Sequence, residues 1–222
     1  TVRAYIEHGC HVDGPQKWYY LGPMFRRERP QKGRYRQFHQ IGVEAFGVAE
    51  PWIDVEQVAL LDDLMGRLGI AATIKLNSVG DAACRPAYLA DLREHLRARA
   101  GELCADCRER SERNPLRVLD CKVDGCQAAI QDAPLLLDRL CDGCRAHFAS
   151  VRHGLDDLGI RHEVEPRLVR GLDYYVRTAY ELVSEHVGAQ SSVAGGGRYD
   201  GLVELLGGPP TPGIGFAIGV ER

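Results

Sequence analysis

Residues 18–28 begin with a run of aromatic and apolar side chains, and residues 36–46 combine aromatic and aliphatic side chains with polar ones. Because the side chains of a strand point to alternate faces, these patterns predict two strands. The segment between them contains Pro30 and Gly33, which interrupt strands and form turns. The pattern therefore predicts a hairpin with a short connecting loop, around which the rest of the chain is organised.

The remaining patterns predict a mixture of helices and strands. Apolar residues recur at intervals of three and four in residues 50–69, as in an amphipathic helix, and residues 72–81 alternate as a strand. Residues 87–159 are rich in helix formers and poor in β-branched residues, which predicts an inserted helical subdomain. Strand patterns return in residues 161–185 and again toward the C-terminus.

The length and net charge of the chain limit the number of domains and the classes of function that it can have. With 222 residues, the chain can form one domain, or one domain and a small insert. No apolar run approaches the roughly 18 residues of a transmembrane helix, so no association with a membrane is expected. The net charge of −3 argues against a protein that binds nucleic acid through bulk positive charge. A local basic site is still expected, because six of the eleven residues 26–36 are Lys or Arg.

The eight cysteines favour a cytosolic protein over a secreted, disulfide-bonded one, because the chain is long and the cysteines fall in closely spaced pairs. Three pairs lie in the predicted helical subdomain: Cys104 and Cys107, Cys121 and Cys126, and Cys141 and Cys144. Two of them have the Cys-x2-Cys spacing that lets two thiolates reach one Zn²⁺. The sequence thus predicts a structural zinc site made of Cys104, Cys107, Cys141 and Cys144. Buried thiols without a metal are the alternative.

The predicted hairpin gathers side chains that can bind a ligand. Arg26 and Glu28 share one face of the first strand. The second strand carries four such residues on one face, namely Arg36, Phe38, Gln40 and Glu44. If the strands pair these faces, one surface holds cations, an aromatic ring, an amide and carboxylates. A strand that only fills a core does not need this set, which suits a ligand with phosphates, a flat base and an ammonium group.

Three segments, in the same order, resemble one family. Residues 25–44 (FRRERPQKGRYRQFHQIGVE) resemble motif 2 of the class II aminoacyl-tRNA synthetases, in the form found in histidyl-tRNA synthetases. Residues 168–181 (LVRGLDYYVRTAYE) resemble the histidine-binding motif of these enzymes. Residues 195–222 (GGGRYDGLVELLGGPPTPGIGFAIGVER) resemble their approach to motif 3. The resemblance covers nearly the whole chain, and the middle matches less sharply.

The resemblance implies an α+β fold with a mainly antiparallel sheet of about six strands flanked by helices. Residues 1–83 would form the first part of the catalytic core, with the motif 2 hairpin, and residues 84–160 the helical insertion. Residues 161–222 would form the second part of the core, with the histidine motif and motif 3. The chain begins and ends abruptly, so motif 1, a threonine-bearing loop and the anticodon-binding domain are expected to lie outside it.

The same resemblance implies a histidine–tRNA ligase. Such an enzyme activates histidine with ATP to histidyl-adenylate, releases pyrophosphate and transfers the histidyl group to the 3′ end of tRNA(His). ATP would be a substrate accompanied by Mg²⁺, and the full-length protein would be a cytoplasmic homodimer. The insertion would approach the acceptor arm of the tRNA through its arginines, namely Arg97, Arg99, Arg108, Arg110 and Arg113.

The resemblance also implies roles for the residues that match the family motifs. Arg26 would contact the α-phosphate and the histidine carboxylate through its planar fork. Arg170 would hold the other side of the α-phosphate, so both arginines are candidates for catalysis and for histidine binding. Arg34 would hold the γ-phosphate. Phe38 would stack on the adenine, with Arg222 on the opposite face as a cation–π partner.

The remaining roles concern the adenine edge and the histidine. Glu28 would accept a hydrogen bond from the adenine amino group. Glu44 and Tyr175 would pair with the two imidazole nitrogens, with Tyr174 beside them, and Gln40 would serve the α-ammonium or carboxylate. A site that pairs both ring nitrogens rejects analogues that lack them.

Two alternatives belong to other classes of protein. One is a catalytically inactive, synthetase-like regulatory subunit of ATP phosphoribosyltransferase, a kind of protein that keeps the fold and tends to lose the specificity motifs. The other is a nucleotide-binding module of unrelated fold. The sequences RYRQFHQ, RGLDYY and GGGRYDG are all intact, which favours the active enzyme.

Overall fold

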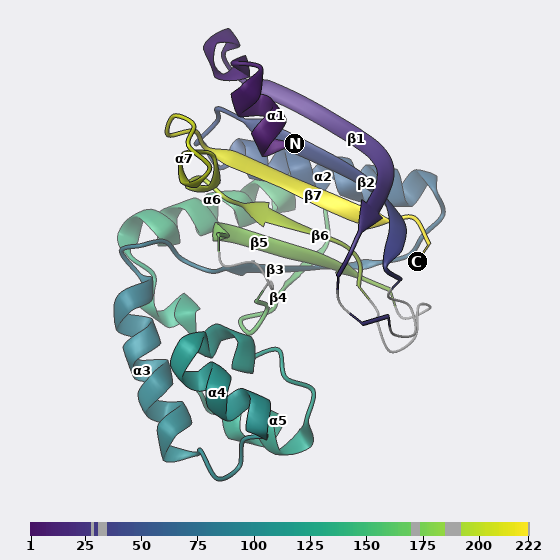
Figure 1. Ribbon diagram of the computed structural model, residues 1–222. Coiled ribbons are helices and arrows are strands. Elements are labelled where there is room, and N and C mark those ends of the chain that lie inside the picture. Colours follow the sequence, from purple (N-terminus) through teal and green to yellow (C-terminus); the bar gives the residue numbers. More distant parts are fainter. Residues whose placement is uncertain (28, 31–34, 170–173, 185–191, 222) are drawn as a thin grey trace.

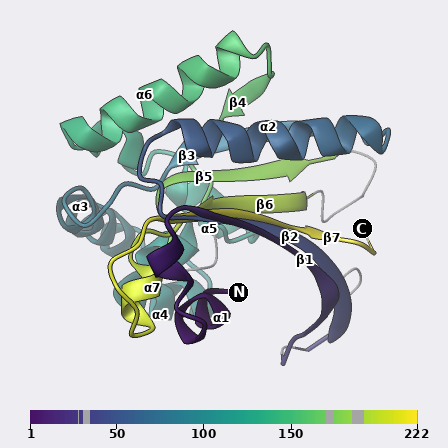
Figure 2. The same ribbon diagram turned by 90° about the horizontal axis from the view of Figure 1, so that it is seen from above.

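The computed structural model describes residues 1–27, 29–30, 35–169, 174–184 and 192–221. One sheet carries helices on both faces, and a helical lobe extends from it (Figures 1 and 2). This arrangement confirms the predicted α+β class. Among the described residues, no helix has the length and apolar character needed to span a membrane.

The predicted hairpin forms one edge of the sheet. Its strands β1 (Gln16–Phe25) and β2 (Gln37–Phe46) pair antiparallel, with Trp18 opposite Glu44. Half-buried and exposed residues alternate along all of β1, which confirms the predicted period of two. One set of β1 side chains therefore faces the interior of the molecule, and the other faces outward.

In the part of the chain that the structure describes, the sheet has five further strands: β3 (Thr73–Ser78), β4 (His162–Val164), β5 (Val176–Val183), β6 (Ser192–Arg198) and β7 (Gly213–Gly219). The seven strands lie in the order β1-β2-β7-β6-β5-β3-β4. Neighbouring strands are antiparallel except β3 and β4, which are parallel. Within the described residues the sheet is mainly antiparallel, as predicted, and its seven strands agree with the expected number of about six.

Two long helices cover one face of this sheet (Figure 2). They are α2 (Trp52–Arg67) and α6 (Asp142–Asp157). Their apolar side chains and those of the strands form one buried core, with Val58, Leu61, Ile74, Val151, Leu155 and Ile214 fully buried. Each such side chain contributes roughly 1.5–3 kcal/mol on burial, so this layer fixes the sheet against the helices.

A buried ion pair lies within this layer. The Arg198 guanidinium, at the end of β6, contacts the Asp54 carboxylate in the first turn of α2, and neither side chain is exposed. Arg198 also donates to the backbone oxygens of Val48 and Glu50, at 3.1 and 3.2 Å, and His147 of α6 lies 3.1 Å from Asp54. Burial opposes ionisation of Asp54, but hydrogen bonds from His147 and Arg198 hold its pKa below the ordinary value. The network joins α2, α6 and β6.

Short helices lie on the other face, beside the hairpin (Figure 2). They are α1 (Val2–Glu7), the 3-10 helix η1 (Cys10–Asp13) and α7 (Leu202–Leu205). The Tyr5 ring of α1 stacks on Phe46 of β2, with 4.4 Å between the ring centroids. This contact holds α1 against the hairpin and leaves the middle of the sheet face uncovered for a ligand.

The helical lobe follows β3 (Figure 1). Its elements are α3 (Arg85–Ala98), α4 (Ala105–Arg113), η2 (Pro115–Val118), α5 (Asp124–Ile130) and η3 (Leu136–Arg139). Leu92, Leu96, Val118 and Ile130 are buried within it. The range 84–160 predicted for the insertion also includes α6, which packs against α2 and the sheet. The boundaries at 84 and 160 stay a prediction.

Candidate functional site

A cavity of about 1040 Å³ opens on the sheet face that α2 and α6 leave uncovered. Ile41 and Val43 of β2 pack toward those helices. Because neighbours on a strand point to opposite faces, Gln40 and Glu44 point away from the helices. Both line the cavity together with Phe38. The structure thus brings together three of the four hairpin residues that the sequence placed on one face.

Glu44 is held where β2 meets β7. Gly215 lies opposite it, and a Cβ atom at Gly215 would lie 1.9 Å from Oε2 of Glu44. A larger residue at Gly215 would therefore displace the carboxyl group. Tyr199 donates its hydroxyl hydrogen to the same oxygen at 2.5 Å. Burial raises the pKa of Glu44 to about 7, although the hydrogen bond from Tyr199 lowers it. The cavity thus contains a carboxyl group that changes charge near neutral pH.

Tyrosines surround this carboxyl group. The ring centroids of Tyr174 and Tyr175 are 5.2 Å apart, and Tyr174 meets Tyr199 edge-on at 6.2 Å. Tyr20 extends across Gly42, where a Cβ atom would lie 2.1 Å from the tyrosine ring. Burial and the nearby negative charge raise the pKa of Tyr20 to about 12, so its hydroxyl stays protonated. These rings and hydroxyl groups form a pocket for a small, flat, polar group.

Arg26 lies at the other end of the hairpin. Its guanidinium carbon is 4.4 Å from the centroid of the Phe38 ring, and both residues line the cavity. Its backbone N–H donates to the oxygen of Arg36 at 2.7 Å, so strand pairing continues beyond β1 and fixes the start of the side chain. A cation over an aromatic face is favourable. A flat base that stacked on this ring face would therefore compete with the guanidinium group.

Four predicted site residues lie outside the described residues, namely Glu28, Arg34, Arg170 and Arg222. Their positions stay predictions. The neighbouring Glu221 is described, and its carboxylate accepts a hydrogen bond from the backbone N–H of His39 at 2.8 Å. Since Glu221 also lines the cavity, the chain reaches the same site as the hairpin at this residue after β7.

The helical lobe supplies one wall of the cavity. Lys122 and Gln127 line it together with Arg167, which directly precedes the predicted histidine motif. Arg167 donates to the backbone oxygens of Ile130 and Gln131, at the end of α5. The lobe and the histidine motif segment are therefore joined beside the cavity.

The lobe arginines expected to reach tRNA have local partners. Arg97 pairs with Glu112, Arg99 with Asp132, Arg110 with Asp106 and Arg113 with Glu109, while Arg108 donates to the backbone oxygen of Leu103. Exposed ion pairs of this kind are weak and exchange readily. Their contact with tRNA stays a prediction.

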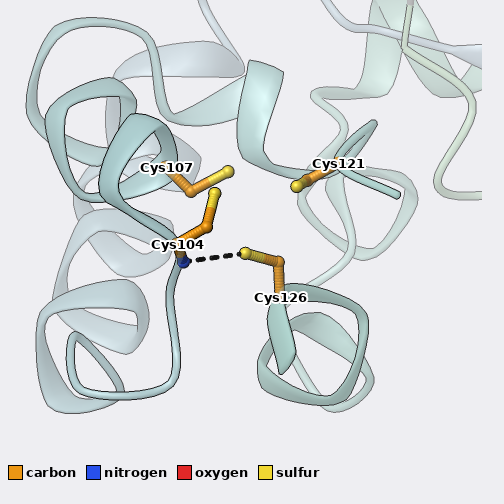
Figure 3. A group of neighbouring side chains, drawn as sticks. All are labelled: Cys104, Cys107, Cys121 and Cys126. Atoms are coloured by element: carbon orange, nitrogen blue, oxygen red, sulfur yellow. Dashed lines mark hydrogen bonds between the residues drawn. The ribbon is translucent and has the colours of Figure 1, made fainter. Parts of the chain in front are cut away.

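The cysteines form two separate clusters, and the predicted zinc ligands are divided between them. Cys104 and Cys107 lie with Cys121 and Cys126 (Figure 3), whereas Cys141 and Cys144 lie with Cys84 and Asp81. The predicted set of Cys104, Cys107, Cys141 and Cys144 is therefore corrected. The physical reason is that the two Cys-x2-Cys pairs begin different helices, α4 inside the lobe and α6 over the sheet.

Three residues of this site were not predicted from the sequence. Tyr20 and Tyr199 face Glu44, and Gly215 makes room for it. Tyr20 could have been predicted, because strand alternation places it on the same face of the first strand as Arg26. Tyr199 and Gly215 stand in the segment that resembles the approach to motif 3, and no local pattern pairs either residue with Glu44.

The site combines two chemical environments. One end holds a carboxyl group of raised pKa among tyrosine hydroxyls, which suits a ring with nitrogen donors and acceptors. The other end holds an arginine beside an aromatic ring, which suits a phosphate next to a flat base. A ligand that spans both ends carries a polar ring and a nucleotide.

Comparisons with known proteins agree with this geometry. The family model described as histidyl-tRNA synthetase matches residues 1–222. The histidine–tRNA ligase of Anaeromyxobacter dehalogenans is 72% identical over 222 residues, which are 100% of this chain and 54% of the ligase. That of Desulfosudis oleivorans is 56% identical over 224 residues, covering 100% of this chain and 53% of the ligase. The chain thus spans about half the length of the curated relatives it matches.

Solved structures give the same result. The crystal structure of apo histidyl-tRNA synthetase from S. aureus matches with a TM-score of 0.78 and 40% identity, over 100% of this chain and 53% of that one. A protein from Bacillus halodurans, described as an ATP phosphoribosyltransferase regulatory subunit/histidyl-tRNA synthetase, has a TM-score of 0.67 at 18% identity, over 99% of this chain and 60% of that one. The second likeness shows only the shared fold. From the match along its whole length and the close relatives, the chain belongs to the histidyl-tRNA synthetase family.

Proposed function

We propose that this chain is part of the catalytic core of a histidine–tRNA ligase. The protein joins histidine to ATP, giving histidyl-adenylate and pyrophosphate, and passes the histidyl group to the 3′ end of tRNA(His). The observation that carries the proposal is the Glu44 carboxyl group, held by Gly215 and Tyr199 inside the cavity. The family membership supplies the reaction.

Arg26 acts on the first step, in which the histidine carboxylate attacks the α-phosphorus of ATP. Two anions approach each other, and negative charge gathers on the phosphate oxygens. Fixed positive charge and alignment lower this barrier more than a proton-transferring base would. Arg26 leaves the Phe38 ring, lets adenine stack there and places its fork between the α-phosphate and the carboxylate. Arg170 holds the opposite side of the phosphate, Arg34 the γ-phosphate, and Arg222 and Glu28 the adenine.

The histidine side chain binds among Glu44, Tyr174 and Tyr175. Glu44 accepts a hydrogen bond from one imidazole N–H, and Tyr175 serves the other ring nitrogen. Gln40, further along β2, serves the α-ammonium or carboxylate of the amino acid. A pocket that pairs both nitrogens discriminates against side chains of similar size that lack them.

We predict that Glu44→Gln has opposite effects on stability and on histidine binding. The folded state raises the pKa of Glu44 to about 7, so the folded protein binds more protons than the unfolded chain between pH about 4.5 and 7. Stability therefore falls as pH rises through this window, by about 3 kcal/mol for this shift. Gln has no proton to lose, so Glu44→Gln does not lose stability over this pH range. Urea unfolding at pH 8 should therefore show that the variant is more stable than the wild type.

The same variant should bind histidine more weakly, by about 1–3 kcal/mol, because an imidazole N–H loses its charged acceptor. Calorimetric titration with histidine measures this loss, and Glu56→Gln is the matched control, since Glu56 is partly exposed on α2, pairs with Lys17 and does not line the cavity. A Glu44→Gln protein that lost both stability and affinity would show a purely structural residue and contradict the assignment.

The test of the function is calorimetric binding of a non-hydrolysable histidyl-adenylate analogue to the intact protein that contains this chain. Tight binding, lost when the histidyl group is replaced by another aminoacyl group, is the expected result. Histidine-dependent exchange of pyrophosphate into ATP then establishes turnover. Binding without exchange would favour the inactive regulatory subunit, and absence of both would refute the proposal.

ATP requires Mg²⁺, and the cavity contains suitable oxygen donors. Asp120, Glu165 and Glu181 line it, and Mg²⁺ prefers one or two carboxylates together with phosphate oxygens and water. One or two of these carboxylates would hold the ion beside the phosphates, whose charge it would neutralise. The positioning of histidine among the tyrosines does not depend on it.

We further propose that the full-length protein is a cytoplasmic homodimer. The outward face of edge strand β1 carries three strongly exposed apolar side chains, Tyr19, Leu21 and Phe25. Exposed apolar groups in one row mark an interaction surface. Sedimentation analysis of a Leu21→Glu variant tests this role, because a charge in a dimer contact should shift the protein toward monomer. We also propose that the chain is divided into a first core part (residues 1–83), a helical insertion (84–160) and a second core part (161–222).

A further inference from the structure

The cysteines of the helical lobe have no part in the chemistry proposed above, yet they converge on one point. The four-cysteine cluster consists of Cys104, Cys107, Cys121 and Cys126. We propose that it binds one structural Zn²⁺ ion. Figure 3 shows that the four sulfur atoms turn toward a common space from the start of α4, from the segment after η2 and from α5.

The spacing of the sulfur atoms suits a single ion. All four lie within 4.8 Å of one another. Sulfur atoms at the corners of a tetrahedron around zinc, each about 2.3 Å from the metal, stand about 3.8 Å apart. Small side-chain rotations complete this geometry. An iron–sulfur cluster contains several metal atoms and needs its thiolates further apart, so the compact arrangement favours zinc.

The backbone around the cluster compensates the charge of such a site. Zn²⁺ and four thiolates carry two negative charges in total. The backbone N–H of Cys104 donates to Sγ of Cys126 at 3.2 Å, as the groups around metal ligands commonly do. Cys104 is also the N-cap of α4, with Cys107 one turn further on, so both lie at the positive end of the helix dipole.

A metal ion would stabilise the helical lobe, two of whose helices are short. Its helices α4 and α5 have 9 and 7 residues, and Cys107 and Cys126 are completely buried between them. Small units that cannot bury a large apolar core are commonly stabilised by a metal ion. Lys122 and Gln127, which line the cavity, directly follow Cys121 and Cys126 in the sequence. Zinc would therefore also fix this wall of the ligand site.

A separate set of contacts carries a second site of the same kind. Cys141 begins α6 with φ −65° and ψ 162°, nearly the values of Cys104, φ −64° and ψ 163°. Its N–H donates to Sγ of Cys84 at 3.1 Å, and its own sulfur accepts from the N–H of Cys144 at 3.5 Å. With Asp81 these residues place four ligand atoms within 4.8 Å. We infer a second Zn²⁺, held by three thiolates and one carboxylate where the chain enters and leaves the lobe.

The test counts zinc in the intact protein, purified without chelator, by elemental mass spectrometry. The expected content is two ions per chain, falling by one in Cys107→Ser and by one in Cys144→Ser. Cys10→Ser is the matched control, because Cys10 belongs to neither cluster, and it should keep both ions. A Cys107→Ser protein with wild-type zinc content overturns the four-cysteine site, and the same result for Cys144→Ser overturns the second site.

A second measurement on the unsubstituted protein covers the case in which a variant does not fold. Zinc is removed with a chelator, exposed thiols are labelled with iodoacetamide, and each cysteine is identified by mass spectrometry. The seven clustered cysteines should gain label when zinc leaves, while the labelling of Cys10 stays constant. Unchanged labelling of Cys104, Cys107, Cys121 and Cys126 would overturn the main site whatever the variants do.

Discussion

Replacement of Arg198 by alanine is expected to lower the free energy of unfolding by about 3–5 kcal/mol at pH 7. The change leaves the fully buried Asp54 carboxylate without its guanidinium partner. It also removes the donors to the backbone oxygens of Val48 and Glu50, which lead into α2. A buried charge that loses its partner keeps the cost of its removal from water, so the loss is much larger than the net worth of the pair.

The dependence of this loss on pH identifies its cause. In the wild type the pKa of Asp54 is lowered, so its contribution is present above the unfolded pKa and disappears as pH falls through the folded pKa. In Arg198→Ala, the guanidinium group no longer opposes the rise in the pKa of Asp54 that burial causes. Asp54 therefore takes up a proton at higher pH than in the wild type. The difference between the two proteins should therefore shrink as urea unfolding is repeated from pH 7 toward pH 5. A difference that did not change with pH would indicate lost packing alone.

Arg67→Ala is the matched control. Arg67 pairs with Asp63 at 2.7 Å, but this pair is on the surface of the same helix. Exposed pairs four residues apart contribute no more than about 0.5 kcal/mol. The two arginines thus separate the effect of burial from the effect of pairing.

Replacement of Arg26 by alanine is expected to reduce the rate of histidyl-adenylate formation by about 10²–10³-fold, the usual effect of removing one fixed donor to a developing negative charge. The affinity for free histidine should change little, because Glu44 and the tyrosines bind the side chain. Histidine-dependent pyrophosphate exchange, measured over a range of histidine concentrations, separates the two effects. Arg26→Lys should recover only part of the rate, because an ammonium group cannot make the bidentate contact.

The control for Arg26 is its neighbour. Arg27 is exposed and, by strand alternation, points away from Arg26. Arg27→Ala should keep nearly the full rate of adenylate formation. Equal losses in the two variants would show that the basic segment attracts ATP only through its total charge, and the assignment of Arg26 to the α-phosphate would then be abandoned.

The hairpin was predictable because its signal is local. Strand alternation alone places Phe38, Gln40 and Glu44 on one face, and the structure keeps them together in the cavity. The partners of Glu44 were not predictable in this way. Tyr199 is 155 residues further along the chain, and it reaches Glu44 only because β6 and β7 bring distant segments beside β2.

The cysteine clusters were likewise only partly predictable from local sequence patterns. The Cys-x2-Cys spacing correctly marks two helix starts at which neighbouring thiols lie close together. It does not say which pairs meet, because that depends on where each helix packs. Cys104 and Cys107 find their partners further along the lobe, whereas Cys141 and Cys144 find theirs before it. The buried contact of Arg198 and Asp54 is likewise decided by the packing of α2 on the sheet.

The wall that the helical lobe contributes to the cavity has a thermodynamic consequence. The cavity is lined by the sheet and, through Lys122 and Gln127, by the lobe, so the binding free energy of a small molecule that contacts both would depend on the position of the lobe. Coupling between two binding events is reciprocal: a macromolecule that docked on the lobe and shifted it would change the affinity for the small molecule by the same factor as the small molecule changes the affinity for it. A partner bound to the lobe would in that case sense whether the cavity is occupied without entering it.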